Sequence, residues 1–360
     1  MSAPFAHLPP LDVTPGPRRA EPLPADRPVR WGVLATGGIA RSFASALRLV
    51  PDDGVLAAVA GRRLENAEAF AAEHGASWTT RAHGSYAALV ADAGVDVVYV
   101  ATPHALHHEH VMLALDAGKP VLCEKAFTVT AAQAEDLVRT ARERNLFLME
   151  AMWMRCNPVI RRIHQLAEQG DLGRIQQVRA DLGFLVDAPE TDRLLAPELG
   201  GGALLDMGVY ALTFAHLFLG DPDKVEAVAE MSSSGIDLNL AISLGWTGGA
   251  VGALSSTMTA YSPRTASIAT DRGRIDLGDA FIHPTEAHWV ADGETHVLRE
   301  AVIGSGLAHE ALEVARCLRN GETESPLVPL EDTVAVMRLM DRIRERIGLR
   351  YAADSTKVGT

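Results

Sequence analysis

Glu124 and Lys125 are the first candidates for chemistry, because they follow a short apolar run, residues 120–123, with the composition of a buried parallel strand. Cofactor and substrate meet in the crevice at the carboxyl ends of such strands, so Lys125 is placed for chemistry and Glu124 for contact with a cofactor. The alternative is a solvated ion pair at the strand end, since structural groups can be perturbed as functional ones are. The two residues alone leave both interpretations open.

Asp206 and Tyr210 form the second candidate pair. They are the polar exceptions in a segment that is apolar almost all round as far as Leu219, which is the pattern of a buried helix. At spacing i, i+4 they share one helix face and can project into one pocket. A buried aspartate is costly unless it is paired or hydrogen-bonded, so Asp206 is expected to have a partner. Backbone N–H groups of the glycine-rich turn 200–202 are the structural alternative to an active site.

A phosphate-binding turn is predicted at residues 35–40, between the strand pattern 29–34 and the helical segment 41–49. Small residues let the backbone approach a pyrophosphate, and a helix start presents free N–H groups and a positive dipole end. Only Gly37 and Ala40 fit the G-x-G-x-x-G/A fingerprint, because Ala35 stands at its first glycine, so an ordinary strand-to-helix turn is the alternative. The cofactor contacts expected here are those of Thr36, Gly37, Gly38, Ile39 and Ala40.

Arg62 and Arg63 follow the next apolar run, residues 55–60, and precede a helical segment over 64–74. Sites for NAD usually carry a carboxylate at this place, which binds the ribose 2′-hydroxyl. A guanidinium instead suits a 2′-phosphate by its charge and its forked geometry. The pair therefore favours NADP over NAD, unless both arginines are plain surface residues.

Four histidines lie between positions 104 and 110, after a strand pattern over 97–101 that breaks at Pro103. His104, His107 and His108 have helical spacing, so a metal site must be considered. Partners with recognisable ligand spacing are lacking, and no metal is predicted. His104 and His107 are interpreted as polar groups that line the cleft, and the cofactor contacts expected at this strand end also include Ala101, Thr102 and Pro103.

Composition restricts the function classes. The formal net charge of -13 argues against nucleic acid or an anionic membrane as a partner, and a small neutral substrate is expected instead. No uninterrupted apolar run approaches membrane-spanning length, and the N-terminus lacks the apolar core of a signal peptide. The three cysteines are far apart, so neither disulfides nor a zinc site is indicated. A cytoplasmic protein is predicted.

The chain divides into three parts. Residues 1–28 hold eight of the nineteen prolines and are interpreted as an extended, mobile arm. Residues 29–150 show the βαβ spacing of a dinucleotide-binding domain, and 151–360 are expected to bind substrate and form the oligomer. In this last part strands are predicted at 174–186, 224–230, 238–246, 250–260 and 273–277, a hairpin turn at 247–249, and amphipathic helices at 307–318 and 331–347.

Five segments together resemble the glucose-fructose oxidoreductase / inositol dehydrogenase (Gfo/Idh/MocA) family, and within it the dihydrodiol and D-xylose dehydrogenase branch. They are residues 31–40, 101–104, 123–125, 150–155 and 200–210. The resemblance implies an α/β fold: a Rossmann domain with a doubly wound parallel sheet, then an α/β domain with an open, largely antiparallel sheet. The free face of that sheet would pair with another subunit, giving a homodimer or larger oligomer.

The same resemblance implies a catalytic role for Lys125 and places Trp153 and Arg155 with Lys125, Asp206 and Tyr210 at the substrate. Two departures stand out. Ala126 replaces the proline common after Glu-Lys, and Tyr210 stands where many members have histidine, as the dihydrodiol branch does.

The expected function is hydride transfer between NADP and a ring hydroxyl of a sugar or cyclic diol, of the aldose 1-dehydrogenase or trans-1,2-dihydrodiol dehydrogenase type. Oxidation needs a base to remove the hydroxyl proton, and Tyr210 is the candidate if the Lys125 ammonium lowers its pKa. Asp206 would orient Lys125 or the substrate, and Lys125 as the direct base is the alternative. Other chemistry on this scaffold stays open: an anhydro- or keto-sugar reductase, an enzyme with a tightly held cofactor, an NAD-dependent glycosidase, or a non-catalytic dinucleotide-binding regulator.

Overall fold

The first sheet has six parallel strands in the order β3-β2-β1-β4-β5-β6. A computed structural model describes residues 11–17, 20–75 and 80–355. The strands are β1 (Val29–Leu34), β2 (Gly54–Ala60), β3 (Arg81–His83), β4 (Val97–Val100), β5 (Val121–Glu124) and β6 (Leu148–Ala151). Most are continuous apolar runs because helices cover both sheet faces. This order reverses direction between β1 and β4, and a ligand crevice lies outside the strand ends at such a point.

Five helices connect these strands: α1 (Gly38–Leu47), α2 (Leu64–His74), α3 (Tyr86–Val90), α4 (His107–Asp116) and α5 (Ala131–Arg144). The predicted strand 29–34 and helix 64–74 have the bounds expected from the sequence. The helical segment predicted to start at residue 41 begins earlier, at Gly38, because the turn itself supplies the first helical residues.

The second sheet has eight strands in the order β14-β13-β12-β11-β7-β10-β9-β8. Among the described strands of this second sheet, only β7 and β10 pair in parallel, so the sheet is largely antiparallel, as expected. The strands are β7 (Ile175–Gly183), β8 (Lys224–Met231), β9 (Asp237–Gly245), β10 (Val251–Thr257), β11 (Ala266–Thr270), β12 (Arg274–Leu277), β13 (Glu286–Ala291) and β14 (Glu294–Arg299). The turn predicted at 247–249 joins β9 and β10, with Gly249 at φ +90°.

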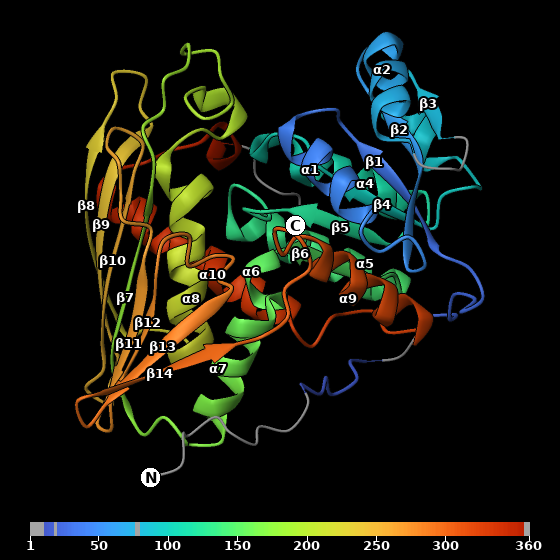
Figure 1. The fold of residues 1–360 in the computed structure, drawn as a ribbon. Helices are drawn as coiled ribbons and strands as arrows, with labels where there is room; N and C mark the ends of the chain where they lie inside the picture. Colours follow the sequence, from blue (N-terminus) through green and yellow to red (C-terminus); the bar gives the residue numbers. More distant parts are fainter. Residues whose placement is uncertain (1–10, 18–19, 76–79, 356–360) are drawn as a thin grey trace.

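Five further helices follow β6: α6 (Trp153–Cys156), α7 (Pro158–Glu168), α8 (Val209–Leu219), α9 (Ala308–Arg319) and α10 (Leu330–Ile347). A π-helical turn, Leu204–Gly208, leads directly into α8. Figure 1 shows α8 and α10 on the side of the second sheet that faces the first domain. The opposite side carries no helix among the described elements.

The last two helices join the two sheets. α9 packs on α1, β2 and α6, and α10 packs on α5 and β6 as well as on α8 and β8. Two helices of the part after residue 150 therefore contact elements of both domains.

The proline-rich arm differs from the mobile segment that we expect from its composition. Over 11–17 and 20–28 it lies against the protein: the Thr323 N–H donates to the Pro17 carbonyl at 2.9 Å, and the Leu23 N–H to the Leu318 carbonyl at 3.0 Å. Arg27 pairs with Asp96 at 2.6 Å. An extended chain has unpaired backbone groups, and here those groups bond to α9 and the turn after it. Residues 1–10 lie outside the described residues.

The stretch Pro197–Leu219 is long and apolar enough to cross a membrane by length and composition alone, which the sequence analysis does not anticipate. The most apolar 18 residues of this stretch are 78% buried inside the protein, between the second sheet and α10. This is the pattern of a core helix, apolar all round because every side is covered.

Candidate active site

Lys125 and Asp206 meet between the two domains. Lys125 comes directly after β5, at the carboxyl edge of the first sheet, and Asp206 lies on the π-helical turn before α8. The Lys125 ammonium donates to the Asp206 backbone carbonyl at 2.7 Å and to its carboxylate oxygen Oδ1 at 3.3 Å. The structure thus brings together two residues that are 81 positions apart.

Asp206 is a buried carboxylate with three basic neighbours. Besides Lys125, Arg193 donates to its Oδ1 at 3.1 Å, and the His104 ring lies 4.0 Å from the same atom. Burial raises the pKa of Asp206, but the charges of Lys125 and Arg193 outweigh it and hold the pKa well below its usual value. Asp206 is therefore ionised at neutral pH, and its negative charge fixes the Lys125 ammonium.

Tyr210 lies in the first turn of α8, and its ring contacts Lys125. Its hydroxyl oxygen accepts a hydrogen bond from the Trp153 indole N–H at 2.6 Å, and the Lys125 ammonium lies 4.9 Å from the centre of its ring. Burial and the nearby charge of Glu124 raise the pKa of Tyr210 well above its usual value. The lowering of this pKa expected from Lys125 is not found, because burial is the largest influence and raises it. Tyr210 keeps its proton in this arrangement.

Glu124 lies behind Lys125 and faces the core. It accepts hydrogen bonds from the Tyr99 hydroxyl and from the Lys125 N–H, and only 6% of it is exposed. Burial raises the pKa of Glu124, although the Lys125 charge opposes the shift. Its carboxyl group therefore braces β4 against β5, and contact with a cofactor stays a prediction.

His104 and His107, both predicted to line the cleft, have different surroundings in the structure. His104 has its Nδ1 2.9 Å from the Gly200 carbonyl, and burial lowers its pKa to about 3, so its ring is neutral and Nδ1 carries the hydrogen. His107 is completely buried and does not line the cleft: its Nε2 lies 2.7 Å from the Thr102 carbonyl and its Nδ1 2.9 Å from that of Ala126. Its ring joins the loops after β4 and β5, a tertiary role that helical spacing cannot reveal.

The turn before α1 has the form expected for binding phosphate. Ala35 adopts a φ of +92°, the left-handed conformation that usually selects glycine, so the backbone keeps the shape although the residue departs from the fingerprint. α1 begins at Gly38, its N-cap residue Gly37 offers no side-chain cap, and a Cβ at Gly37 or Gly38 would meet nothing within 4 Å. The first N–H groups of α1 thus face open space, where a pyrophosphate fits.

The other cofactor residues surround this turn at the ends of the neighbouring strands. The Ala35 N–H donates to Ala60 of β2, which places the exposed Arg62 and Arg63 beside the turn. On the other side, the Ala101 N–H donates to the Leu34 carbonyl at 3.1 Å. Within the described part of the chain, no hydrogen bond or ion pair of the Arg62 side chain is found, so it is available for a phosphate. Thr36 and Ile39 lie on the open side of the turn, Ala40 packs into the core, and Thr102 and Pro103 follow Ala101.

The two substrate-binding candidates on α6 lie apart. Trp153 reaches Tyr210 and stacks on His283, with 5.2 Å between ring centres. Arg155 points elsewhere and pairs with Asp332 at the start of α10, at 2.7 Å. Among the described residues, Arg155 forms no hydrogen bond or ion pair with Lys125, Asp206 or Tyr210, so the structure does not bring it to the site.

Sequence reasoning does not find three residues of this site. Arg193 lies in the loop before the glycines, His283 lies in the loop between β12 and β13, and Tyr99 is the polar member of an apolar strand. The first two have no periodic or spacing signal, because only tertiary packing brings them to Asp206 and Trp153. Tyr99 could have been found, since its strand neighbours the one that ends at Glu124.

Within the described residues, no group of three or more His, Cys, Asp or Glu side chains could hold a metal ion. His108 points away from the other histidines and pairs with Asp136 at 2.8 Å.

Comparisons with known proteins identify the family of this chain. Models of the oxidoreductase family GFO/IDH/MocA match residues 29–152, as its NAD-binding Rossmann fold, and 160–276, as its C-terminal domain. Trans-1,2-dihydrobenzene-1,2-diol dehydrogenase of Bos taurus is 34% identical, over 91% of this chain and 99% of that protein. D-xylose 1-dehydrogenase (NADP(+)) of Hypocrea jecorina is 36% identical, over 90% and 93%.

A solved structure extends the likeness. KijD10, a 3-ketoreductase from Actinomadura kijaniata in complex with NADP and TDP-benzene, has a TM-score of 0.79 and 29% identity, over 89% of this chain and 98% of that one. The Rossmann domain, the second sheet and the matches over nearly the full length of these relatives all agree. The chain belongs to the GFO/IDH/MocA family of oxidoreductases.

Proposed function

We propose that the protein is an NADP-dependent oxidoreductase that transfers hydride between the nicotinamide and a carbon bearing a ring hydroxyl of a neutral sugar or cyclic diol. The contact of Lys125 with Asp206, beneath Tyr210 and at the carboxyl edge of the Rossmann sheet, carries this proposal. It places an ammonium and a phenol where substrate and cofactor meet in this fold.

The residues around α1 would hold the cofactor. The free N–H groups that follow Gly37 suit its pyrophosphate, and the exposed Arg62 suits a 2′-phosphate. The bound nicotinamide would supply or accept the hydride. The chain itself supplies the binding, the orientation and the movement of the proton.

Two donors of the chain can bind the reacting oxygen. The Lys125 ammonium has a third hydrogen free for a substrate after its two contacts with Asp206, and the Tyr210 hydroxyl still has its own hydrogen to donate. In reduction, Tyr210 can give its proton to the oxygen as hydride reaches the carbon. In oxidation, one of these two groups must first lose a proton before it can accept the hydroxyl proton, so oxidation is expected to accelerate as pH rises.

Reduction of a keto sugar is the second candidate, and two observations favour it. The raised pKa of Tyr210 keeps the proton that a carbonyl oxygen needs, and the chain resembles a 3-ketoreductase over most of its length. The two candidates share one site and differ in the direction in which it works.

One experiment separates these functions. Purified protein is given NADP⁺ or NAD⁺ with a panel of aldoses and trans-dihydrodiols, and NADPH with keto sugars, while the absorbance of the reduced cofactor is followed. Turnover that requires NADP supports the proposal, and its direction selects the candidate. Tight NADP binding without turnover on any member would instead support a non-catalytic regulator.

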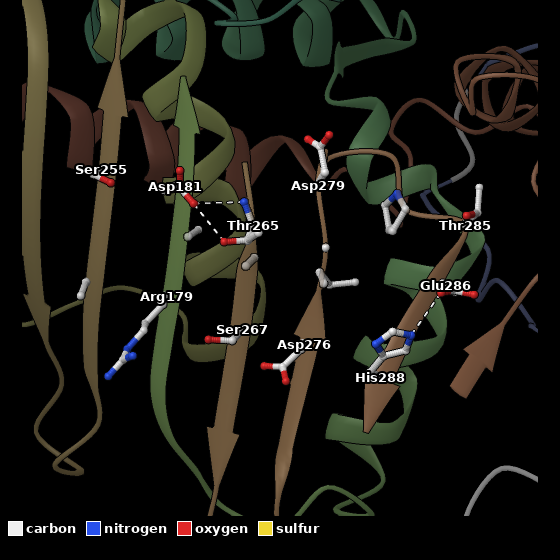
Figure 2. Close-up of a pocket in the computed structure, with 16 residues that line it drawn as sticks. Arg179, Asp181, Ser255, Thr265, Ser267, Asp276, Asp279, Thr285, Glu286 and His288 are labelled. Atoms are coloured by element: carbon white, nitrogen blue, oxygen red, sulfur yellow. Dashed lines mark hydrogen bonds and ion pairs between the residues drawn. The ribbon is translucent and has the colours of Figure 1, made fainter. Parts of the chain in front are cut away.

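We also infer that two copies pair through the open face of the second sheet. Residues there alternate with the buried ones, and Val228, Val251 and Val297 are exposed apolar members of this sheet. A hollow of about 740 Å³ lies on the same face, lined by acidic groups such as Asp276 and by Arg179 (Figure 2). Charges of both signs beside apolar positions suit a self-complementary contact. Sedimentation of wild type and of Val228→Asp tests this, because a 38.4 kDa monomer of the wild type at micromolar concentration would contradict it.

A further inference from the structure

Asp237 is a fully buried carboxyl group whose environment offers it almost no partner. It begins β9, directly against the π-helical turn that carries Asp206, and none of it is exposed. Its Oδ2 accepts a hydrogen bond from the Leu204 N–H at 2.7 Å. Its Oδ1 has no hydrogen-bond partner among the residues that the structure describes. Burying a carboxyl group with a single hydrogen bond costs free energy. The contact with the Leu204 N–H offsets part of this cost.

The chain is shaped around this carboxyl group. Gly202 precedes the turn with a φ of +124°, and a Cβ built on it would lie 2.2 Å from the Asp237 Oδ1. No other residue fits at that distance. The close approach of Asp237 therefore explains why residue 202, the third glycine of the turn 200–202, is a glycine. This contact between Gly202 and Asp237 sets where the π-helical turn begins.

The contact acts on the segment that carries two of the site residues. Leu204 is the first residue of the π-helical turn, Asp206 is two residues further on, and Tyr210 follows in α8. The first N–H groups of a helical segment lack partners within the helix, and a buried one needs an acceptor. A π-turn is a rare and less regular element that is frequently found at functional sites, so an external contact is needed to fix its rotation.

We propose that Asp237 is a positioning residue: its buried carboxylate holds the Leu204 N–H and thereby sets the orientation in which Asp206 and Tyr210 face Lys125. Its effect on turnover rests on the proposed oxidoreductase function. Its effect on the geometry of the site does not.

Among the residues that the structure describes, Asp237 has no direct partner of opposite charge. Tyr351 packs nearby with its buried hydroxyl unpartnered, and Arg344 stacks on the Tyr351 ring at 4.7 Å while pairing with Asp341 and Asp354. Burial therefore raises the pKa of Asp237 to about 7, although the Leu204 N–H opposes the shift. The carboxyl group is neutral at lower pH and becomes a charged, stronger acceptor as pH rises.

Two substitutions and one signal test the proposal. Asp237→Asn keeps an acceptor oxygen for the Leu204 N–H, and Asp237→Ala removes it. The signal is the indole N–H resonance of Trp153, which reports its hydrogen bond to Tyr210 and is assigned as the resonance lost in Trp153→Phe. Asp223→Asn is the matched control, since Asp223 also accepts a backbone N–H, that of Thr247, but on an exposed turn.

We expect Asp237→Ala to shift the Trp153 resonance and lower turnover about tenfold or more, because small displacements of catalytic groups are costly. Asp237→Asn should leave the resonance in place and should lack the rise in the turnover of oxidation that ionisation of Asp237 gives the wild type near pH 7. Asp223→Asn should match the wild type in both.

An unshifted resonance and full turnover in folded Asp237→Ala would overturn the proposal, as would superimposable pH profiles of wild type and Asp237→Asn. If Asp237→Ala does not fold, Gly202→Ala replaces it, since its methyl group would displace the Asp237 contact, and an unshifted resonance there would overturn the proposal equally. Absence of turnover in the wild type would contradict the proposed function, while the resonance would still decide the role of Asp237.

Discussion

The ammonium of Lys125 is held twice by Asp206, through the backbone carbonyl at 2.7 Å and the carboxylate at 3.3 Å. One residue ends a strand of the first sheet, and the other precedes the central helix of the second domain. A partner lost from such a buried pair leaves an uncompensated charge, so the two side chains are expected to behave as one unit.

Lys125→Met should lower turnover by about a hundredfold or more, because it removes a group that, in the proposed mechanism, binds the reacting oxygen and moves its proton. It should also raise the pKa of Asp206, since the Lys125 charge is the main influence that lowers it. Turnover numbers at saturating NADP and substrate measure the first effect. Lys224→Met, at the exposed start of β8, is the control. Turnover of Lys125→Met within threefold of the wild type would remove Lys125 from the chemistry.

Arg62→Asp should weaken NADP binding far more than NAD binding. An arginine–phosphate contact is charge-assisted and often bidentate, whereas aspartate repels the 2′-phosphate and can accept from a ribose 2′-hydroxyl. Titration of each cofactor, followed by protein fluorescence, gives the ratio of the two dissociation constants. Arg299→Asp, a substitution of an exposed arginine on β14, is the control. Equal affinities in the wild type, or an unchanged ratio in Arg62→Asp, would show that the site does not select NADP through this residue.

The parts of the fold that the sequence predicts are those with continuous or strictly periodic patterns. β1 and α2 have the expected bounds because their patterns are uninterrupted. β11, β13 and β14 are not predicted. β14, with the sequence ETHVLR, has only two apolar residues, because it is an edge strand with one side toward solvent. Such strands are recognised only once their neighbours in the sheet are known.

The candidate site likewise has features that the sequence pattern predicts and features that depend on tertiary contacts. Spacing places Asp206 and Tyr210 on one helical segment, and the structure brings both to Lys125, although a π-helical turn replaces the regular helix assumed for them. The direction of the Tyr210 pKa cannot be read from residue types, because it depends on how completely the phenol is buried and on where the ammonium lies. Arg193 is likewise found only through the tertiary contact that it makes.

Asp96→Asn should destabilise the protein near neutral pH but not in strong acid. Burial opposes ionisation of Asp96, but Arg30 and Arg27 outweigh it and lower the pKa of Asp96 to about 2. A carboxyl group whose pKa is lower in the folded state stabilises above its unfolded value, about 4, and this contribution disappears as pH falls toward 2. Thermal unfolding from pH 2 to 7 measures it, with about 1 kcal/mol expected at pH 7 for a partly exposed pair. A constant difference between variant and wild type across this range would contradict the argument.

Tyr210→Phe should lower turnover by about a hundredfold while leaving NADP binding intact, because the proposed mechanism places the phenol at the reacting oxygen and the cofactor phosphates at the turn around Gly37. The pH dependence should differ by direction. Since burial and the Glu124 charge keep Tyr210 protonated, reduction by the wild type should be fastest on the acid side and oxidation on the alkaline side, and both dependences should weaken in Tyr210→Phe. Tyr261→Phe, at an exposed tyrosine, is the matched control. Near wild-type turnover of Tyr210→Phe on the best substrate found would transfer the proton-moving role to Lys125, and a loss of NADP affinity in Tyr210→Phe would show that the phenol belongs to the cofactor site.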